Sequence, residues 1–244
     1  MKIAVDLHIH TGLSPCADNS MTPHNIINMA LLKKLNAIAI TDHNTTGNLE
    51  NFMKVADHYP IICIPGIEIT TKEEVHLIVL FEGINDAKQF QKIIDDKLPK
   101  VKNNKHLFGE QLLYDEGDQV IKEYEYFLLG ALQLSLEQVI EKVKEIGGVC
   151  IPAHVDRPNN SILSNLGFIP PQLEINAIEY SKSCDIKMFN SVHKNLEGYG
   201  HIQSSDAHRL GDILERVFFL DVLDLNTAGV LNSIKSGQGA KPNN

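Results

Sequence analysis

The sequence predicts an α/β domain built as a barrel of alternating strands and helices. Short apolar stretches typical of buried strands alternate with stretches whose apolar residues recur at helical spacing. This alternation indicates βα units and a parallel sheet. About seven such units fit in a chain of 244 residues, which favours a closed barrel over an open doubly wound sheet. We therefore expect a single domain over residues 1–235.

The apolar stretches predict strands at 3–5, 37–41, 61–69, 75–81, 148–152, 173–179, 201–205 and 216–220. Helical spacing predicts helices at 23–35, 49–57, 86–96, 135–146 and 227–235. Pro23 behind Thr22 is typical of the first turn of a helix. Gly147 is typical of a helix end, so it closes the helix that begins at Ser135.

Residues 99–134 interrupt the alternation. This segment is longer than an ordinary connection, and it carries lysines, then the acidic stretch 115–118, then aromatic residues. We expect a helical insertion with one or two helices, packed as an extra layer outside the barrel. A lid or a dimer surface is the alternative. Residues 236–244 are expected to form a flexible tail.

The composition argues against several classes of protein. A net charge of −9 argues against extended nucleic acid as a partner, because such binding needs a basic surface. No apolar stretch approaches the ~18 residues of a membrane span, and the chain starts with a strand instead of a signal segment. Cys63 and Cys150 lie in apolar strands, which favours buried free thiols. We therefore expect a cytoplasmic protein without membrane contact, whose oligomeric state the sequence leaves open.

Two histidines in the first strand are the first chemical signal. His8 and His10 are two residues apart, so strand alternation places both side chains on one side, with Cα atoms ~6–7 Å apart. Two imidazoles in this arrangement can bind one metal ion. Such a pair alone is weak support, because half-exposed strands also carry histidines.

Further candidate ligands stand in or directly after later strands: Asp42, His43, Glu68, His76, His154, Asp206 and His208. The carboxyl ends of barrel strands meet at one mouth, so we expect these side chains to converge on a polynuclear metal site. Each has a structural alternative, since a single histidine at a strand end is more often a core or loop residue. Asp18, in the loop after the first strand, would by itself most often stabilise a turn.

Five separated motifs carry a resemblance to a known family: DLHIHT at 6–11, ITDHNT at 40–45, GIEIT at 66–70, PAH at 152–154 and SSDAH at 204–208. In this order they resemble the motifs of the PHP (polymerase and histidinol phosphatase) superfamily. The resemblance implies a distorted (β/α)7 TIM-like barrel with two or three divalent ions at the carboxyl ends of its strands. It also implies hydrolysis of a phosphoester.

By position, the resemblance implies three ligand sets: His8, His10, Glu68 and Asp206; Asp18, His43 and His208; and Glu68, His76 and His154. Many members have a histidine where this chain has Asp18. An oxygen ligand there favours harder ions, so Mn²⁺, Mg²⁺ or iron are candidates beside Zn²⁺.

These ions predict the chemistry of the site. A metal-bound hydroxide would attack phosphorus, while Asp206 or His208 adjusts its protonation. Asp42 would accept an N–H bond that fixes a ligand histidine. Arg157 and Arg209, close in sequence to His154 and His208, are the candidate phosphate binders. It is about equally plausible that each arginine pairs with a nearby acid.

The expected function is that of a metal-dependent hydrolase for a small phosphorylated substrate, such as a phosphomonoester, a nucleotide or a cyclic phosphodiester. A nuclease or polymerase-associated proofreading module is the first alternative. A non-catalytic metal-binding regulatory protein is the second. Hydrolysis of an amide or lactone on the same barrel stays open, because a fold does not determine its reaction.

Overall fold

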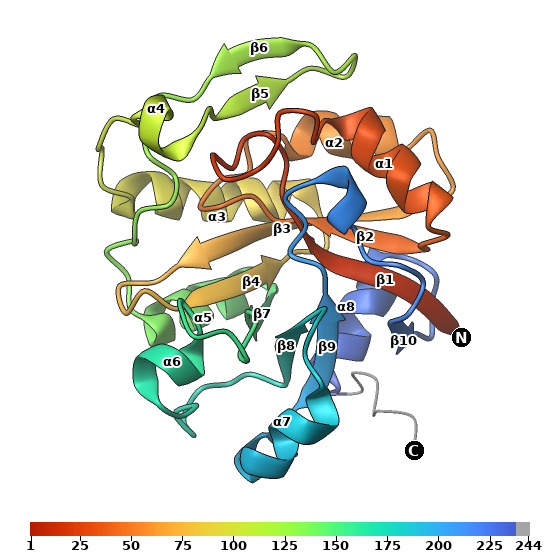
Figure 1. Ribbon diagram of the computed structural model, residues 1–244, viewed down its shortest axis with the longest axis vertical. Coiled ribbons are helices and arrows are strands. Elements are labelled where there is room, and N and C mark those ends of the chain that lie inside the picture. The colour runs from red at the N-terminus through yellow and green to blue at the C-terminus, as the bar shows by residue number, and fades with distance from the viewer. Residues whose placement is uncertain (238–244) are drawn as a thin grey trace.

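A computed structural model of the chain, which describes residues 1–237, has an α/β fold around a curled six-stranded sheet (Figure 1). The order of the strands in this sheet is β10-β1-β2-β3-β4-β7. Their bounds are β1 Lys2–Ile9, β2 Ala37–Ile40, β3 Ile62–Thr70, β4 His76–Leu80, β7 Val149–Pro152 and β10 Phe219–Asp221. Most of the tail expected at 236–244 lies outside the described residues.

The remaining strands form two smaller sheets: β8 (Ala177–Ser181) pairs with β9 (Gly200–Ser204), and β5 (Leu112–Tyr114) pairs with β6 (Val120–Glu123). The helices are α1 Pro23–Leu32, α2 Leu49–Ala56, α3 Ile84–Lys97, α4 Lys105–Phe108, α5 Leu136–Ile146, α6 Ile162–Leu166, α7 Ile186–Val192 and α8 Thr227–Lys235. Every predicted strand and helix has a counterpart, although β8 begins four residues later than expected, at Ala177. No helix of the described part is long and apolar enough to cross a membrane.

The sheet differs from the expected all-parallel arrangement. Strands β1, β2 and β3 are parallel, but β4 is antiparallel to both β3 and β7, and β10 is antiparallel to β1. The reason is the connection 71–75, whose five residues are too short for the crossover that a parallel neighbour needs. The strands therefore do not form a regular succession of seven βα units.

The curl of the sheet brings the end of the chain to its beginning. β8 and β9 form a parallel pair, and the segment after β9 continues to β1 through a parallel bridge between Ile9 and Ala207. The N–H of His10 donates to the carbonyl of Ala207, and the N–H of Ala207 donates to that of His8. This pairing places the segment 204–208 directly beside the two histidines of β1.

Side chains on the two faces of the sheet belong to different hydrophobic clusters. Ile3, Val5 and Leu7 pack on the face covered by α8, while helices α1, α2, α3 and α5 cover the opposite face. The register between β1 and β2 shifts between Asp6 and Ile9. Such an irregularity re-aims the side chains that follow it, here toward the carboxyl ends of the neighbouring strands.

The segment 99–134 is not the helical insertion that the sequence predicts. It contains one helical turn, α4, and the hairpin β5–β6, drawn in light green at the top of Figure 1. The acidic stretch forms the turn of this hairpin, because the Asp115 carboxylate accepts the N–H groups of Gly117 and Gln119. Asp118 follows with φ +63°, a conformation that aspartate tolerates better than most residues.

Two contacts tie this segment to the loop after β1. The Asp118 carboxylate accepts the N–H of His24 and the hydroxyl of Thr22, so the hairpin tip caps the first turn of α1. Gly109, with φ +103°, lies so close to Pro15 that a Cβ would stand 1.9 Å from the Pro15 carbonyl oxygen. The segment therefore packs against the loop that borders the carboxyl end of β1.

Candidate metal centre

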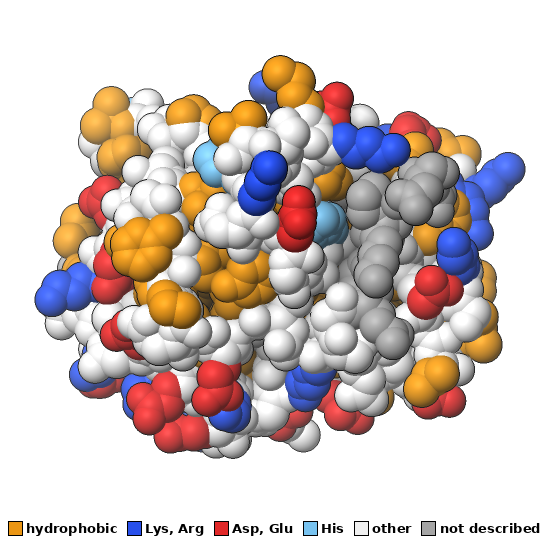
Figure 2. Space-filling view, turned by 90° about the horizontal axis from the view of Figure 1, so that it is seen from below, with side chains coloured by type: hydrophobic (Ala, Val, Ile, Leu, Met, Phe, Trp, Pro, Cys, Tyr) orange, Lys and Arg blue, Asp and Glu red, His pale blue; other side chains and the backbone are white. Residues whose placement is uncertain are grey.

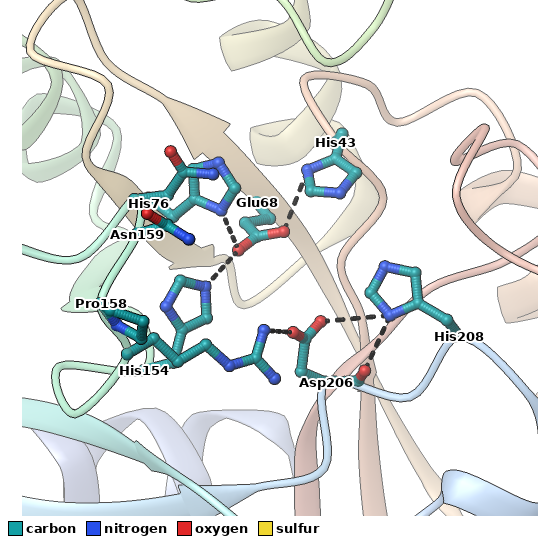
Figure 3. Close-up of a pocket in the computed structure, with 10 residues that line it drawn as sticks. His43, Glu68, His76, His154, Pro158, Asn159, Asp206 and His208 are labelled. Carbon is teal, nitrogen blue, oxygen red and sulfur yellow. Dashed lines mark hydrogen bonds and ion pairs between the residues drawn. The ribbon is translucent and has the colours of Figure 1, made fainter. Parts of the chain in front are cut away.

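Glu68 lies at the centre of a cluster of histidines that meet at one end of the sheet, where β4 begins and its neighbours end (Figure 3). Its side chain is 1% exposed, and both carboxylate oxygens face imidazole nitrogens. Oε1 is 2.8 Å from His76 Nδ1 and 3.3 Å from His154 Nε2. Oε2 is 3.0 Å from His43 Nδ1. The partners of this buried acid are therefore histidines from several parts of the chain.

The first predicted ligand set comes together. His8 and His10 from β1 have their Nε2 atoms 3.0 Å apart. The Oδ1 atom of Asp206 is 3.2 Å from His8 Nε2 and 3.0 Å from His10 Nε2. Glu68 Oε2 is 3.4 Å and 3.3 Å from the same two nitrogens. Four donor atoms from the beginning, middle and end of the chain thus surround one point.

The second predicted set is different in one member. His43 and His208 lie close to His10, so these three histidines form the second group of ligand atoms. Among the described residues, no such group includes Asp18. The Asp18 carboxylate instead accepts the N–H of Ser20, the turn-stabilising role that short acidic side chains often take in loops.

The thiol of Cys16 stands beside this group, with its Sγ atom 3.1 Å from His208 Nε2. The third set contains His76 and Glu68, as the resemblance implies, together with His43. His154, the other residue expected there, touches the same carboxylate.

The charges of the cluster are strongly coupled. Burial alone would raise the pKa of Glu68, but the surrounding histidines hold it well below its usual range. Burial would likewise lower the pKa of His10, but hydrogen bonds to Asp206 and Glu68 raise it to about 9. Burial and the neighbouring His10 lower the pKa of His208 to about 4. His43 is also shifted well below its usual pKa, chiefly by burial, so this ring and that of His208 are neutral at pH 7.

The arrangement fits divalent metal ions. Ligands bound at the usual 2.0–2.2 Å from one ion lie about 3.0–3.5 Å from each other, close to the spacing of these atoms. His43 Nδ1 and Glu68 Oε2 are buried without hydrogen-bond partners among the described residues, although only 3.0 Å separates them. Two buried acceptors oriented toward a common point, without the angle of a hydrogen bond, are satisfied by a cation between them.

Asp42 supports the cluster less directly than predicted. Its buried carboxylate accepts the N–H and hydroxyl of Thr11 and the hydroxyl of Ser14, and no histidine ring donates to it. Ser14 makes the link, because its Oγ atom is 2.9 Å from His10 Nδ1. The Ser14 hydroxyl donates to Asp42, so its oxygen accepts from His10 Nδ1, and Nε2 of the ring is left to face the cluster. Ser14 carried no signal of this role in the sequence.

Glu179, in the middle of β8, is a second residue of the site that sequence reasoning missed. Its carboxylate is 2% exposed and lies 3.0 Å from His8 Nδ1. The signal was present, since Glu179 is an acid inside an apolar strand, as Glu68 is. It falls outside the motifs that carried the family resemblance.

The two predicted phosphate-binding arginines lie in different places. Arg157 lines a cavity of about 260 Å³ above the cluster, and its guanidinium donates to Oδ2 of Asp206. Arg209 is exposed and does not line this cavity. The pKa of Asp212 is lowered first by a hydrogen bond from Lys182 and further by the charge of Arg209.

Two residues of the site have unusual backbone conformations. His154 has φ +31° and Asp206 has φ +52°, values in the left-handed region that few non-glycine residues adopt. Such conformations cost of order 1–3 kcal/mol each and persist where the surroundings hold them. Both residues direct their side chains into the same cluster.

Comparison with known proteins identifies the family of the chain. A family model described as the PHP domain matches residues 6–182. Protein YqxK of Bacillus subtilis is 31% identical over 144 residues, which cover 57% of this chain and 31% of that protein. The 5'-3' exoribonuclease Rnm of Escherichia coli is 24% identical over 201 residues, covering 65% of this chain and 68% of that protein.

A third relative is a 3',5'-nucleoside bisphosphate phosphatase of Chromobacterium violaceum, 31% identical over 87 residues, or 34% of this chain and 29% of that protein. The chain thus spans less than a third of the length of YqxK and of this phosphatase. Among solved structures, the lesion-specific endonuclease PfuEndoQ of Pyrococcus furiosus has a TM-score of 0.68 at 20% identity, over 97% of this chain and 56% of that one. The matched family model covers most of the chain and all the clustered residues except Asp206 and His208, and the chain belongs to the PHP domain family.

Proposed function

We propose that the chain is a metal-dependent phosphoesterase that hydrolyses a small phosphorylated substrate. The observation that carries this proposal is the cluster of six histidines around two carboxylates at the floor of an open cavity. Membership of the PHP domain family, with a phosphatase and a ribonuclease among the relatives, supports the reaction class.

The charge of the ligand set supports an anionic substrate. Six of the eight ligand side chains are imidazoles, and Glu68 and Asp206 supply two negative charges. Two divalent ions would bring four positive charges, so the loaded centre would carry a net charge of about +2. An acidic protein can therefore attract phosphate at this point, although its net charge is −9.

Each ligand set has a proposed task. His8, His10, Glu68 and Asp206 would hold one ion, and His10, His43 and His208 would surround a second. Glu68, His76 and His154 would hold a third where three are bound. Bound divalent ions of zinc, manganese, iron or magnesium would lower the pKa of a water molecule and offset charge on the phosphate.

The protein itself would supply orientation. Arg157, at the wall of the cavity, would hold non-bridging phosphate oxygens through its guanidinium. The rings of His208 and His76 border the same cavity, where they would serve as ion ligands. Asp206 would orient its ring partners while Oδ2 stays paired with Arg157.

A nucleic acid substrate is the second candidate. The acidic net charge argued against it, but the relatives include an exoribonuclease, and a structural neighbour was solved with a 27-mer duplex at its active site. On the face seen in Figure 2, basic and acidic side chains are interspersed. That face lacks the continuous basic footprint typical of duplex binding. A single-stranded end entering the cavity would need fewer contacts.

A substrate panel separates the two candidates. Ion-free protein is reloaded with Mn²⁺, Zn²⁺ or Mg²⁺ and assayed with p-nitrophenyl phosphate, bis-p-nitrophenyl phosphate, nucleoside monophosphates, histidinol phosphate and a short oligonucleotide. The proposal expects turnover of a small ester with a kcat/KM well above that for the oligonucleotide. Preference for the oligonucleotide would establish the nuclease alternative, and no turnover by metal-loaded protein would reject both.

A further inference from the structure

The Glu179 carboxylate bridges two parts of the metal centre. Its Oε1 atom is 3.0 Å from His8 Nδ1, and Oε2 is 3.2 Å from the same nitrogen. Oε1 also accepts the backbone N–H of His154 at 3.1 Å. One buried side chain therefore contacts a histidine of the first ligand set and the backbone of a histidine of the third.

The contact with His8 determines which ring nitrogen carries the proton. The carboxylate oxygens accept in this contact, so Nδ1 of His8 is the donor. The opposite nitrogen, Nε2, then offers its lone pair toward Asp206 Oδ1 and Glu68 Oε2, 3.2 Å and 3.4 Å away. A histidine held in this way is oriented as a ligand before the ion arrives.

The contact with His154 holds a strained backbone. His154 has φ +31°, and its N–H has the Glu179 carboxylate as acceptor. The main chain of Glu179 adds a second tie, because its carbonyl accepts the N–H of Val155 at 2.8 Å. These bonds span the gap between β7 and β8, two strands that belong to different sheets. The position of His154 over Glu68 thus depends on Glu179.

We infer that Glu179 is a positioning residue of the metal centre, which fixes the tautomer of His8 and the backbone of His154 for ion binding. It does not reach the cavity lining itself, so it acts through these two histidines. The inference rests on the proposed metal centre and adds a residue that neither the family motifs nor the ligand spacing includes.

The substitution Glu179→Gln tests this role without removing the side chain. The amide oxygen can still accept the His154 N–H, so the fold is retained. The amide nitrogen, however, takes the Oε2 position, 3.2 Å from His8 Nδ1, where a donor replaces an acceptor and weakens the hold on the His8 ring. Loss of such supporting partners typically weakens metal binding by about 10- to 100-fold.

The measurement is a titration of ion-free protein with Co²⁺, followed by the visible absorption of the bound ion, with thermal unfolding in chelator as the test of fold. Glu174→Gln, an exposed acid just before β8, is the matched control. We expect Glu179→Gln to lose about 10- to 100-fold in Co²⁺ affinity with an altered spectrum, while its unfolding temperature in chelator stays near wild type.

The outcomes separate the two proposals. Wild-type affinity in Glu179→Gln, or an equal loss in Glu174→Gln, would overturn the role of Glu179 and leave the metal centre intact. A lower unfolding temperature in chelator without a change in Co²⁺ affinity would make Glu179 a purely structural residue. A wild-type protein that binds no Co²⁺ would instead reject the proposed function.

Discussion

At the scale of single residues, the centre is organised by carboxylates whose two oxygens have separate partners. Glu68 directs Oε2 to His8 and His10, and Oε1 to His76 and His154. Asp206 directs Oδ1 to His8 and His10, while Oδ2 pairs with Arg157. This separation leaves only Oδ1 of Asp206 facing the ring nitrogens. Asp206 would therefore contact a cation at this point through Oδ1.

The pairing of Arg157 predicts a difference between the two arginines. Because Arg157 lines the cavity and Arg209 does not, Arg157→Ala should lower kcat/KM by about 10- to 100-fold, the usual effect of one hydrogen bond to a charged group. Arg209→Ala should stay within about threefold of wild type. Steady-state kinetics on the best phosphoester of the panel make the comparison. An equal or larger loss in Arg209→Ala would contradict the assignment of the cavity as the substrate site.

The sequence predicted the clustered ligand side chains better than the residues that position those ligands. His8, His10, Glu68 and Asp206 converge as expected, since strand alternation and strand ends determine where they point. Asp18 does not, because a nearby N–H of Ser20 competes for its carboxylate. Ser14 and Glu179 could not be predicted in their roles, since these depend on distances across 28 to 171 residues of chain.

At the scale of elements, loop length and turn chemistry decide what periodicity leaves open. The sequence correctly predicted that the residues of β4 form a strand. The direction of this strand follows from the five-residue connection to β3. The hairpin β5–β6 escaped prediction because strands of three and four residues are too short for a periodic pattern. Its turn, built around Asp115 and Asp118, was the available signal.

The hairpin tip predicts a stability effect far from the centre. Asp118→Ala removes the acceptor for His24 N–H and Thr22 hydroxyl, and it places alanine at φ +63°. We expect a loss of about 1 kcal/mol and a fall of about 2–4 °C in unfolding temperature. Asp118→Asn keeps an acceptor and tolerates this φ, so it should retain most of the stability. Equal unfolding temperatures for both variants would contradict the capping role.

At the scale of the whole molecule, the fold gathers ionisable side chains in one cluster, and the hydrogen bonds within that cluster do not satisfy all of them. The curl of the sheet and the bridge from Ile9 to Ala207 gather groups from the two ends of the chain. The sequence predicted this convergence through the barrel, but not the break between β7 and β8. Local sequence patterns do not predict that break, because it depends on how the segment between the two strands packs.

The coupled histidines predict an unusual pH dependence for the ion-free protein. His10 has its pKa raised to about 9, so its contribution to folding is present below pH 6.5 and is lost as pH rises toward 9. His208 has its pKa lowered to about 4, so stability falls as pH drops from 6.5 toward 4. The free energy of unfolding in chelator should therefore be greatest near pH 6.5.

Urea unfolding in chelator and in the presence of Mn²⁺, between pH 5 and 8.5, measures this effect. The ion competes with the proton of His10, so bound Mn²⁺ should remove the decline on the alkaline side. The same alkaline decline with and without Mn²⁺ would show that these histidines do not bind the ion.

The most direct test of the metal-dependent centre is phosphoester turnover before and after ion removal, in wild type beside His10→Ala and Asp206→Ala. We predict that chelation abolishes hydrolysis of p-nitrophenyl or bis-p-nitrophenyl phosphate, that Mn²⁺ or Zn²⁺ restores it, and that neither variant recovers while both keep the circular dichroism of the folded protein. Full activity in both folded variants, or turnover that survives complete removal of the ions, would contradict the account.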